Sequence, residues 1–258
     1  MTARKAVISG ASKGIGYAIA ERLAADGADV GLLASNEERL KDAAKRIQKE
    51  TGKRAAYHAV DLRTLQGCEE AHREIAAALG GCDILVNSAG ATKGGVWPEQ
   101  ADEEWEDGFA LKFYSAVRLA RLFWPALVAA RGTVINIVGG FARTPAADFM
   151  VGGVVNAALS NFSKALAAQG LRDDVNVNWV HPGLTVTERL DGIFDGRAKQ
   201  QGKTRDQVEK ETIAHEGIRR LGQPKDVAAL VAFLCSDEAR HIQGTAIQID
   251  GGGTPGYY

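Results

Sequence analysis

The 258-residue sequence has few of the features that mark several large classes of protein. Its three cysteines, Cys68, Cys82 and Cys235, are scattered without C-x-x-C spacing, which argues against a disulfide framework and favours reduced core thiols. No apolar run approaches the roughly 18 residues that a membrane span needs, and no basic block indicates nucleic-acid binding. The first apolar strand begins within a few residues, so we expect no signal peptide. These absences predict a cytoplasmic protein with no metal site and no nucleic-acid or membrane partner.

The composition is that of a globular protein with a sizeable core. Hydrophobic residues make up 45% and charged residues 24% of the chain, and the formal net charge is -1. We find no linker, repeat or low-complexity segment, so residues 1–258 are expected to form one domain. Residues 187–220 are polar and irregular with helical patches, and we expect them to form a substrate lid.

Strand and helix patterns alternate along the chain. Strands are predicted at residues 6–8, 29–34, 55–60, 83–86, 133–138, 175–180 and 246–249. Helices are predicted at residues 15–23, 37–50, 65–79, 103–130, 148–169 and 227–234. The alternation predicts an α/β Rossmann fold, a doubly wound parallel sheet of about seven strands with helices on both faces. Ligands in such sheets bind beyond the carboxyl ends of the strands.

A glycine-rich stretch joins the first strand to the first helix. Glycine allows a tight turn and a close approach of a diphosphate, and a helix N-terminus offers free N–H groups and a positive dipole end. An ordinary glycine-rich loop is the alternative interpretation. The candidate nucleotide-binding residues of this turn are Gly10, Ser12, Lys13, Gly14, Ile15 and Gly16.

Further motifs follow the later strands. They are Asp61-Leu62, Asn87-Ser88-Ala89-Gly90, Pro182-Gly183 with Thr187, Gln243-Gly244 and Asp250-Gly251-Gly252. In this order, with the glycine-rich turn, they resemble the short-chain dehydrogenase/reductase family, in particular its 3-oxoacyl-acyl-carrier-protein reductase members. The resemblance implies that Asp61 contacts adenine and Thr187 the nicotinamide amide. It also implies that cofactor contacts come from Leu62, Asn87, Ala89, Gly90, Pro182 and Gly183.

The end of the second strand bears on the choice of cofactor. Sites that prefer NAD place an acid there for the ribose hydroxyls. Here Ser35 and Asn36 stand at that end, with no acid before Glu37, and Lys13 lies in the glycine-rich turn. The resemblance therefore implies a preference for NADP(H), with NAD(H) as the alternative.

The usual catalytic residues of the family, an Asn, a Ser and the Tyr and Lys of Y-x-x-x-K, are missing. Their positions hold Lys112, Gly139, Gly152 and Asn156 respectively, and the sequence has no Y-x-x-x-K elsewhere. The replacement of Ser and Tyr by Gly is expected to leave volume above the nicotinamide. A decayed site is the alternative.

An exchange of residue types motivates a different catalytic set. The family's Asn position holds Lys112 and its Lys position holds Asn156. We predict that these side chains face each other, directly or through one water, and that Lys112 is the proton donor because desolvation lowers a lysine pKa. The alternative is that Lys112 points to solvent.

His181, at the end of the sixth strand, is a third catalytic candidate, with a structural histidine as the alternative. Weaker candidates are Asp148, Tyr114 and a Tyr257 or Tyr258 supplied by a neighbouring subunit.

Two classes of function remain open at this point. The first is an NADP(H)-linked oxidoreductase acting on a small carbonyl or alcohol substrate with an atypical acid/base site. The second is a cofactor-binding protein without conventional redox turnover, such as a sensor or a partner subunit; a lyase or isomerase is a further alternative. Apolar helical faces at residues 119–127 and 157–166 resemble the family's dimer-forming pair, so we expect a homotetramer, with a dimer as the alternative.

Overall fold

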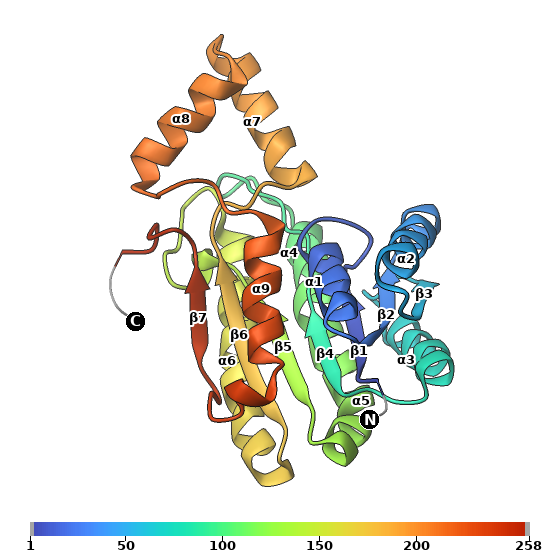
Figure 1. Cartoon of the computed structure of the whole chain (residues 1–258). Helices are drawn as coiled ribbons and strands as arrows, with labels where there is room; N and C mark the ends of the chain where they lie inside the picture. Colours follow the sequence, from blue (N-terminus) through green and yellow to red (C-terminus); the bar gives the residue numbers. More distant parts are fainter. Residues whose placement is uncertain (1–2, 256–258) are drawn as a thin grey trace.

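The computed structural model describes residues 3–255 and contains one parallel sheet of seven strands in the order β3-β2-β1-β4-β5-β6-β7 (Figure 1). The order reverses between β1 and β4, which creates the switch point where ligands bind in such sheets. The strands are β1 (Lys5–Ser9), β2 (Asp29–Ala34), β3 (Ala55–Ala59), β4 (Ile84–Asn87), β5 (Thr133–Ile137), β6 (Asn176–Pro182) and β7 (Ala246–Ile249). The predicted doubly wound α/β fold is confirmed.

Helices cover both faces of the sheet (Figure 1). The main helices are α1 (Gly14–Ala25), α2 (Glu37–Thr51), α3 (Leu65–Leu79), α4 (Asp102–Gly108), α5 (Ser115–Ala130), α6 (Met150–Asp173), α7 (Glu188–Gln201), α8 (Arg205–Glu216) and α9 (Pro224–Leu234). Shorter elements are the π-helical η1 (Phe109–Tyr114) and the 3-10 turns η2 (Gly140–Ala142) and η3 (Asp237–Ala239). Tyr257 and Tyr258 lie outside the described residues.

Two apolar cores lie on opposite faces of the sheet because successive strand side chains alternate. On β1, Ile8 contributes to one core and Val7 to the other. Helices α1, α2 and α9 supply the first core, whereas α3, α5 and α6 supply the second. The inner strands β1, β2, β4, β5 and β6 are largely buried on both faces, which explains their mainly apolar character, whereas the edge strands β3 and β7 are partly exposed. All three cysteines are free thiols buried in these cores.

The long helix predicted at residues 103–130 is interrupted. It consists of α4, the π-helical segment η1 and α5. A π-helical turn bonds residue i to i+5 and so inserts an extra residue relative to an α-helix. The apolar periodicity continues through it, so the sequence pattern did not reveal the interruption. Lys112 lies inside η1.

Residues 187–220 are more regular than predicted. They form the helices α7 and α8, which project above the carboxyl end of the sheet (Figure 1). Thr187 and Thr204 cap the two helix N-termini, and Gly202 and Gly217 end the helices in left-handed conformation. The pair has a small core of its own, formed by Leu190, Phe194, Val208, Ile218 and Leu221.

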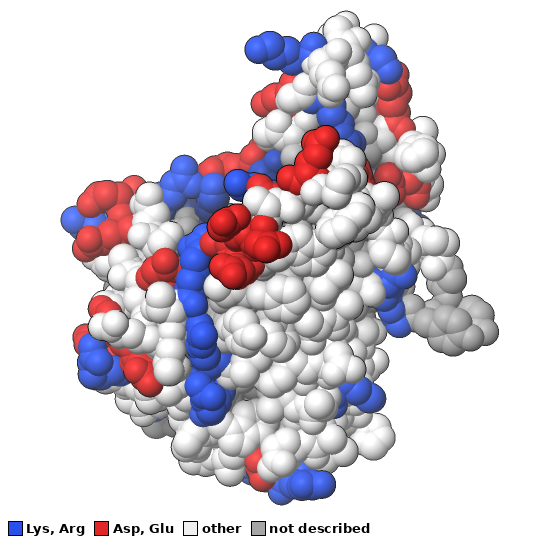
Figure 2. Space-filling model, turned by 180° about the vertical axis from the view of Figure 1, so that it is seen from behind, with Lys and Arg blue, Asp and Glu red and all other residues white. Residues whose placement is uncertain are grey.

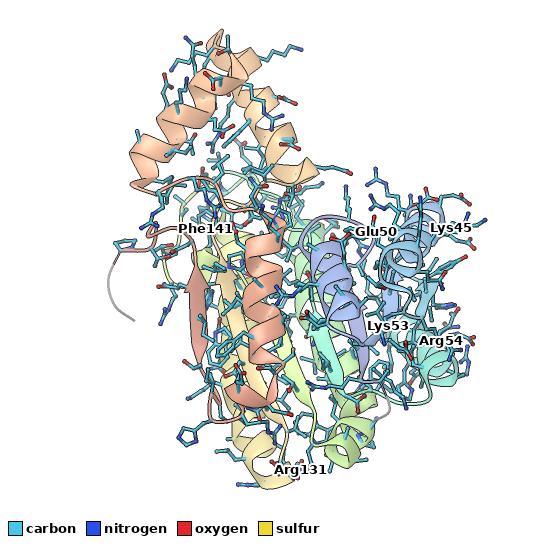
Figure 3. The ribbon with its side chains drawn as sticks, viewed as in Figure 1. Lys45, Glu50, Lys53, Arg54, Arg131 and Phe141 are labelled. Atoms are coloured by element: carbon cyan, nitrogen blue, oxygen red, sulfur yellow. The ribbon has the colours of Figure 1, made fainter. Side chains whose placement is uncertain are left out.

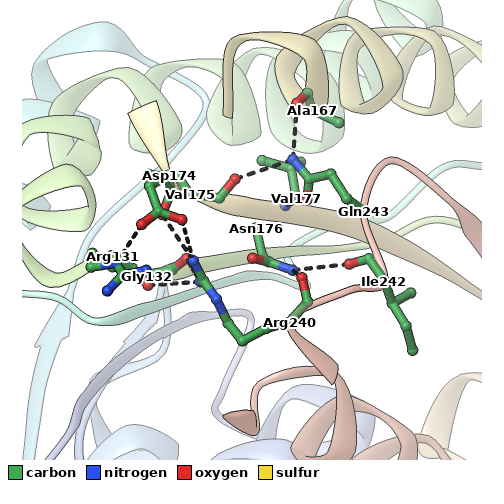
Figure 4. Close-up of polar contacts among 10 residues, drawn as sticks. All are labelled: Arg131, Gly132, Ala167, Asp174, Val175, Asn176, Val177, Arg240, Ile242 and Gln243. Atoms are coloured by element: carbon green, nitrogen blue, oxygen red, sulfur yellow. Dashed lines mark hydrogen bonds and ion pairs between the residues drawn. The ribbon is translucent and has the colours of Figure 1, made fainter. Parts of the chain in front are cut away.

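The opposite end of the sheet is closed by polar contacts (Figure 4). Arg240 donates to the Arg131 carbonyl at 2.8 Å and pairs with Asp174 at 2.6 Å. The Gln243 side chain accepts from the Val177 N–H at 2.8 Å. These contacts hold the loop before β7 against the starts of β5 and β6. This end is thus structural, and the carboxyl end carries the candidate site.

Within residues 3–255 no helix is both long and apolar enough to cross a membrane.

Candidate active site

The glycine-rich turn has the geometry that its sequence predicts. Gly10 and Gly14 have φ of +69° and +60°, the left-handed region that favours glycine. A Cβ on Gly10 would lie 2.9 Å from the Ala89 backbone, and one on Gly16 would lie 2.3 Å from the Gly10 carbonyl oxygen. Ser9 Oγ accepts from the N–H groups of Ser88 and Ala89, both at 3.1 Å, and so joins the β4 end to the turn.

The start of α1 can accept a diphosphate. The helix begins at Gly14, and its N-cap residue Lys13 makes no side-chain capping bond. The first N–H groups of the helix therefore lack a side-chain partner, and the dipole of the helix favours an anion there. Ser12 and Lys13 line a hollow next to this turn, whereas Ile15 packs partly against the core. The turn fits the phosphates of a dinucleotide.

The loop after β6 returns to the same turn. A Cβ on Gly183, which follows Pro182, would lie 2.7 Å from Asp250 Cα, so only glycine fits between the β6 and β7 ends. Thr187 accepts from Leu190 N–H at 3.4 Å as the α7 cap, and its Cγ2 lies 3.4 Å from the position of a Cβ on Gly14. The structure therefore brings Thr187 beside the glycine-rich turn.

Several predicted cofactor residues have structural tasks that limit what their side chains can contact. Asn36 Oδ1 accepts from Arg39 N–H at 2.9 Å as the α2 cap. Asn87 is buried and donates to Asn136 on β5 at 2.8 Å. Leu62 is 2% exposed and belongs to the core, so it can offer only backbone atoms. Asp61 is exposed and pairs with Arg63 at 3.2 Å.

A basic hollow lies between the glycine-rich turn and α2, beyond the β2 end where Ser35 stands. Its charged lining contains four bases and two acids. Sequence reasoning missed the bases Arg39, Lys45 and Arg46 of α2, although they lie with an acid at the i, i+3 and i+4 spacing of one helix face. Figure 3 shows Lys45 projecting from α2, away from the sheet. The hollow is lined by Ser12, Lys13, Arg39, Asp42, Lys45, Arg46 and Glu188.

Lys112 is directed toward the carboxyl end of β5. Its stem packs on Gly90, where a Cβ would lie 2.9 Å from Lys112 Cδ, and its Nζ lies 3.5 Å from the Val138 carbonyl oxygen. Burial and the positive charge of Arg189 lower the pKa of Lys112 to about 8. The π-helical turn that carries Lys112 is a form often found at functional sites. The solvent-facing alternative is wrong.

Asn156 approaches the same strand end from α6. Its side chain is 4% exposed, its Nδ2 lies 3.0 Å from the position of a Cβ on Gly139, and its Oδ1 has no hydrogen-bond partner among residues 3–255. Lys112 and Asn156 thus approach the consecutive residues Val138 and Gly139. No direct hydrogen bond joins the two side chains within the described chain, so contact through one water stays a prediction.

His181 completes the group. Its ring is 1% exposed, and Nδ1 lies 2.9 Å from the Gly139 carbonyl oxygen. Because a carbonyl accepts, Nδ1 carries the proton in this contact. Burial is the largest influence and lowers the pKa of His181, with Arg143 and Lys112 acting in the same direction. The three predicted catalytic residues are therefore brought together around Val138 and Gly139.

The expectation of vacated volume at Gly152 is wrong. A Cβ on Gly152 would lie 1.9 Å from Phe149 Cε1, so the Phe149 ring already occupies that space. Phe149 also packs on Phe141, with ring centroids 4.8 Å apart. Figure 3 shows Phe141 near the upper end of the sheet, below α7 and α8. The Arg189 guanidinium of α7 also lies over the Phe149 ring, 5.8 Å from its centroid, and donates to the Thr92 carbonyl at 2.7 Å.

The tyrosines within residues 3–255 do not replace the missing one. Tyr17 donates to Glu21 on α1 at 2.7 Å, Tyr57 lies on β3, and Tyr114 is 47% exposed at the end of η1. None of these three hydroxyl groups hydrogen-bonds a residue of the candidate site.

A parallel sheet with a glycine-rich turn at its switch point defines a dinucleotide-binding α/β protein. The family model described as Enoyl-(Acyl carrier protein) reductase matches residues 10–254. The chain belongs to the short-chain dehydrogenase/reductase family.

Relatives and solved structures agree with this placement. The 3-oxoacyl-[acyl-carrier-protein] reductase FabG of Salmonella typhimurium is 33% identical over 251 residues, 96% of each chain. The L-sorbose reductase of Gluconobacter frateurii, solved with NADPH and L-sorbose, has a TM-score of 0.96 and 34% identity and covers 100% of this chain and 98% of its own. An NADPH-bound short chain oxidoreductase of Pseudomonas aeruginosa, described as containing an atypical catalytic center, has a TM-score of 0.90 and 26% identity over 98% of both chains.

Proposed function

We propose that this protein is an NADP(H)-linked oxidoreductase that interconverts a carbonyl and an alcohol, with Lys112 in place of the family's tyrosine. The main support is that Lys112, Asn156 and His181 all approach Val138 and Gly139 at the end of β5. We take this strand end as the site of chemistry, because it keeps buried polar groups although we assign changed residues to all four of the family's usual catalytic positions.

Two observations support NADP(H) over NAD(H). The end of β2 carries Ser35 and Asn36 in place of the acid that binds the ribose hydroxyls of NAD. The adjacent hollow is lined by four bases, Lys13, Arg39, Lys45 and Arg46. Solved relatives such as the L-sorbose reductase hold NADPH. The cofactor would be held by the turn at 10–16, by Ser35 and the α2 bases, and by the backbone and side chains at the ends of β3, β4 and β6.

Each residue of the site has a distinct task in this proposal. The bound cofactor supplies the hydride. The Lys112 ammonium gives a proton to the oxygen of the reduced carbonyl, and its depressed pKa makes it a usable donor near neutral pH. Asn156 offers a buried amide for a hydrogen bond with the substrate or with Lys112 through water. His181 holds the Gly139 carbonyl and fixes the strand end.

The wider organisation is also part of the proposal. Residues 1–258 act as one domain in which residues 187–220 form the substrate lid, since α7 and α8 stand over the carboxyl end of the sheet. We further propose a homotetramer, with a dimer as the alternative, acting in the cytoplasm.

The test is NADPH oxidation against a panel of small aldehydes, ketones and keto esters. K112M should lower kcat by about 100-fold or more, the usual contribution of a general acid, while the NADPH Kd stays unchanged. K199M, on the exposed side of α7, is the matched control and should behave as wild type. Unchanged turnover in K112M would reject the role of Lys112. NADPH binding without turnover of any panel member would favour a cofactor-binding protein without redox activity.

A further inference from the structure

Glu188, the first residue of α7, connects the α7–α8 pair to the nucleotide-binding half. Its Oε2 lies 3.0 Å from Arg39 Nη1 on α2, and the same oxygen accepts from Lys13 Nζ in the glycine-rich turn. Hydrogen bonds from Lys13 and Arg39, in that order, hold the pKa of Glu188 below its usual range. One carboxylate oxygen therefore bridges two bases that are 26 residues apart in the sequence.

The hollow around this carboxylate is suited to an anion. Its lining holds four bases, Lys13, Arg39, Lys45 and Arg46, against only Asp42 and Glu188 as acids. Two of the four bases are already paired with Glu188. An incoming anion that uses Lys13 and Arg39 must therefore share them with this carboxylate or displace it, since like charges at such separations repel.

We propose that Glu188 is a specificity-determining residue, an internal anion that competes with the 2′-phosphate of NADP(H) for Lys13 and Arg39. The proposal rests on the proposed function for the identity of the cofactor. NAD(H) carries no 2′-phosphate and leaves the Glu188 pairs intact, whereas NADP(H) breaks them. The preference for NADP(H) or NAD(H) therefore depends on whether the N-terminus of α7 stays bound, through Glu188, to the nucleotide-binding half.

The coupling has a structural path. Thr187, the residue before Glu188, caps α7 and lies against Gly14 of the glycine-rich turn. Two charged side chains of the first turn of α7 bond to residues outside the α7–α8 pair within residues 3–255. Glu188 pairs with the two bases, and Arg189 donates to the Thr92 carbonyl. When the Glu188 ion pairs are lost, the Arg189 hydrogen bond to Thr92 is the remaining contact of a charged side chain from this turn with residues outside the α7–α8 pair. The linkage is reciprocal, so an anion that releases α7 binds more weakly while α7 is attached.

Calorimetry with two cofactor fragments tests the competition on the full chain. The probes are 2′,5′-ADP, which carries the 2′-phosphate, and 5′-AMP, which does not. E188Q should bind 2′,5′-ADP about two- to tenfold more tightly than wild type, the range expected for losing exposed ion pairs. Its affinity for 5′-AMP should stay unchanged. E209Q on α8 makes the same charge change away from the hollow and should alter neither affinity.

Equal or weaker binding of 2′,5′-ADP by E188Q would overturn the proposal, because the carboxylate would then position the bases instead of competing for them. This outcome leaves the proposed function standing. If neither wild type nor E188Q binds either fragment, the nucleotide-binding function fails, and the role of Glu188 fails with it. The fragments lack nicotinamide, so no outcome depends on turnover.

Hydrogen exchange tests the coupling to α7 separately. Addition of 2′,5′-ADP to wild type should speed amide exchange in residues 188–192, whereas 5′-AMP at equal saturation should not. In E188Q the exchange should be fast without ligand and insensitive to both. Slower or unchanged exchange in wild type with 2′,5′-ADP would overturn the release of α7.

Discussion

At the scale of single residues, Lys112 is the side chain on which the proposed chemistry depends most. Its stem lies on Gly90, and its ammonium lies near the end of β5 in a partly buried position. Arg189 adds a second positive charge near this ammonium. A lysine in such surroundings loses its proton more readily than one in water.

The pH dependence of turnover follows from this pKa. In carbonyl reduction the donor must carry its proton, so kcat/KM should fall above pH about 8, approaching tenfold per pH unit. K112M should lack this inflection in its residual activity. A wild-type profile that stays flat to pH 10 would contradict the assignment.

The same pKa has a consequence for stability. The folded value of about 8 lies below the unfolded value of about 10.4, so between these pH values the unfolded chain binds more protons. The free energy of unfolding should therefore gain a stabilising contribution as pH rises through this window. Urea unfolding measures this effect: over that pH range the free energy of unfolding of wild type should rise relative to that of K112M. A difference between the two proteins that does not change with pH would contradict a lowered pKa.

Gly152 is required by Phe149 rather than by an open pocket. A Cβ at residue 152 would meet the Phe149 ring, although alanine is favoured over glycine in helices by up to about 1 kcal/mol. G152A should thus destabilise wild type yet stabilise the F149A variant, as measured by chemical denaturation in a double-mutant cycle. An equal effect in both backgrounds would mean that the two residues are not coupled.

At the scale of elements, the α7–α8 pair differs from the rest because its core is separate. Phe194 is 1% exposed and packs within that small cluster, whereas Phe123 is equally buried in the main core between sheet and α5. Regions with few contacts to the main core open locally at a lower free energy than the whole molecule.

F194A should therefore raise hydrogen exchange in residues 188–216 while the strands keep their protection. F123A, the matched control, should lower global stability by about 3–5 kcal/mol and raise exchange throughout. Exchange that rises equally in the sheet of F194A would show that the pair does not open as a separate unit.

At the scale of the whole molecule, the face formed by α5 and α6 is the candidate for self-association. Seen from behind, the molecule presents a broad area with few charged side chains (Figure 2). A groove on this side is lined mainly by apolar residues, namely Val117, Ala120, Trp124, Pro125, Phe162 and Leu166, with Arg121 and Gln169. Exposed apolar patches are typical of protein interfaces and of ligand grooves, so we expect self-association to use this face.

The expected assembly is a homotetramer, with a dimer as the alternative, measured by light scattering at micromolar concentration. V117R places a charge in the groove and should lower the molecular mass to that of a smaller assembly. I193R changes an exposed apolar residue of α7 and should leave the mass unaltered. A wild-type protein that is only monomeric would refute the interface.

Much of this protein follows from its sequence because the relevant signals are local. The inner strands are largely buried on both faces, so most of them are short apolar runs. The glycines at 10, 14 and 16 are dictated by backbone geometry and close contact. These features predicted the sheet, the switch point and the nucleotide-binding turn. The caps at Thr187 and Thr204 were also readable, and weighing them would have revealed α7 and α8 as regular helices.

Only the tertiary structure decided what depends on contacts between distant segments. The direction of Lys112 is one case, because the π-helical turn keeps the apolar pattern of an α-helix while changing its geometry. The filling of the Gly152 position by Phe149 is another, since volume is invisible to residue type alone. Glu188 is a third: its partners Lys13 and Arg39 lie about 150 or more residues away in the chain, and only the return of β6 to the glycine-rich turn brings the three charges together.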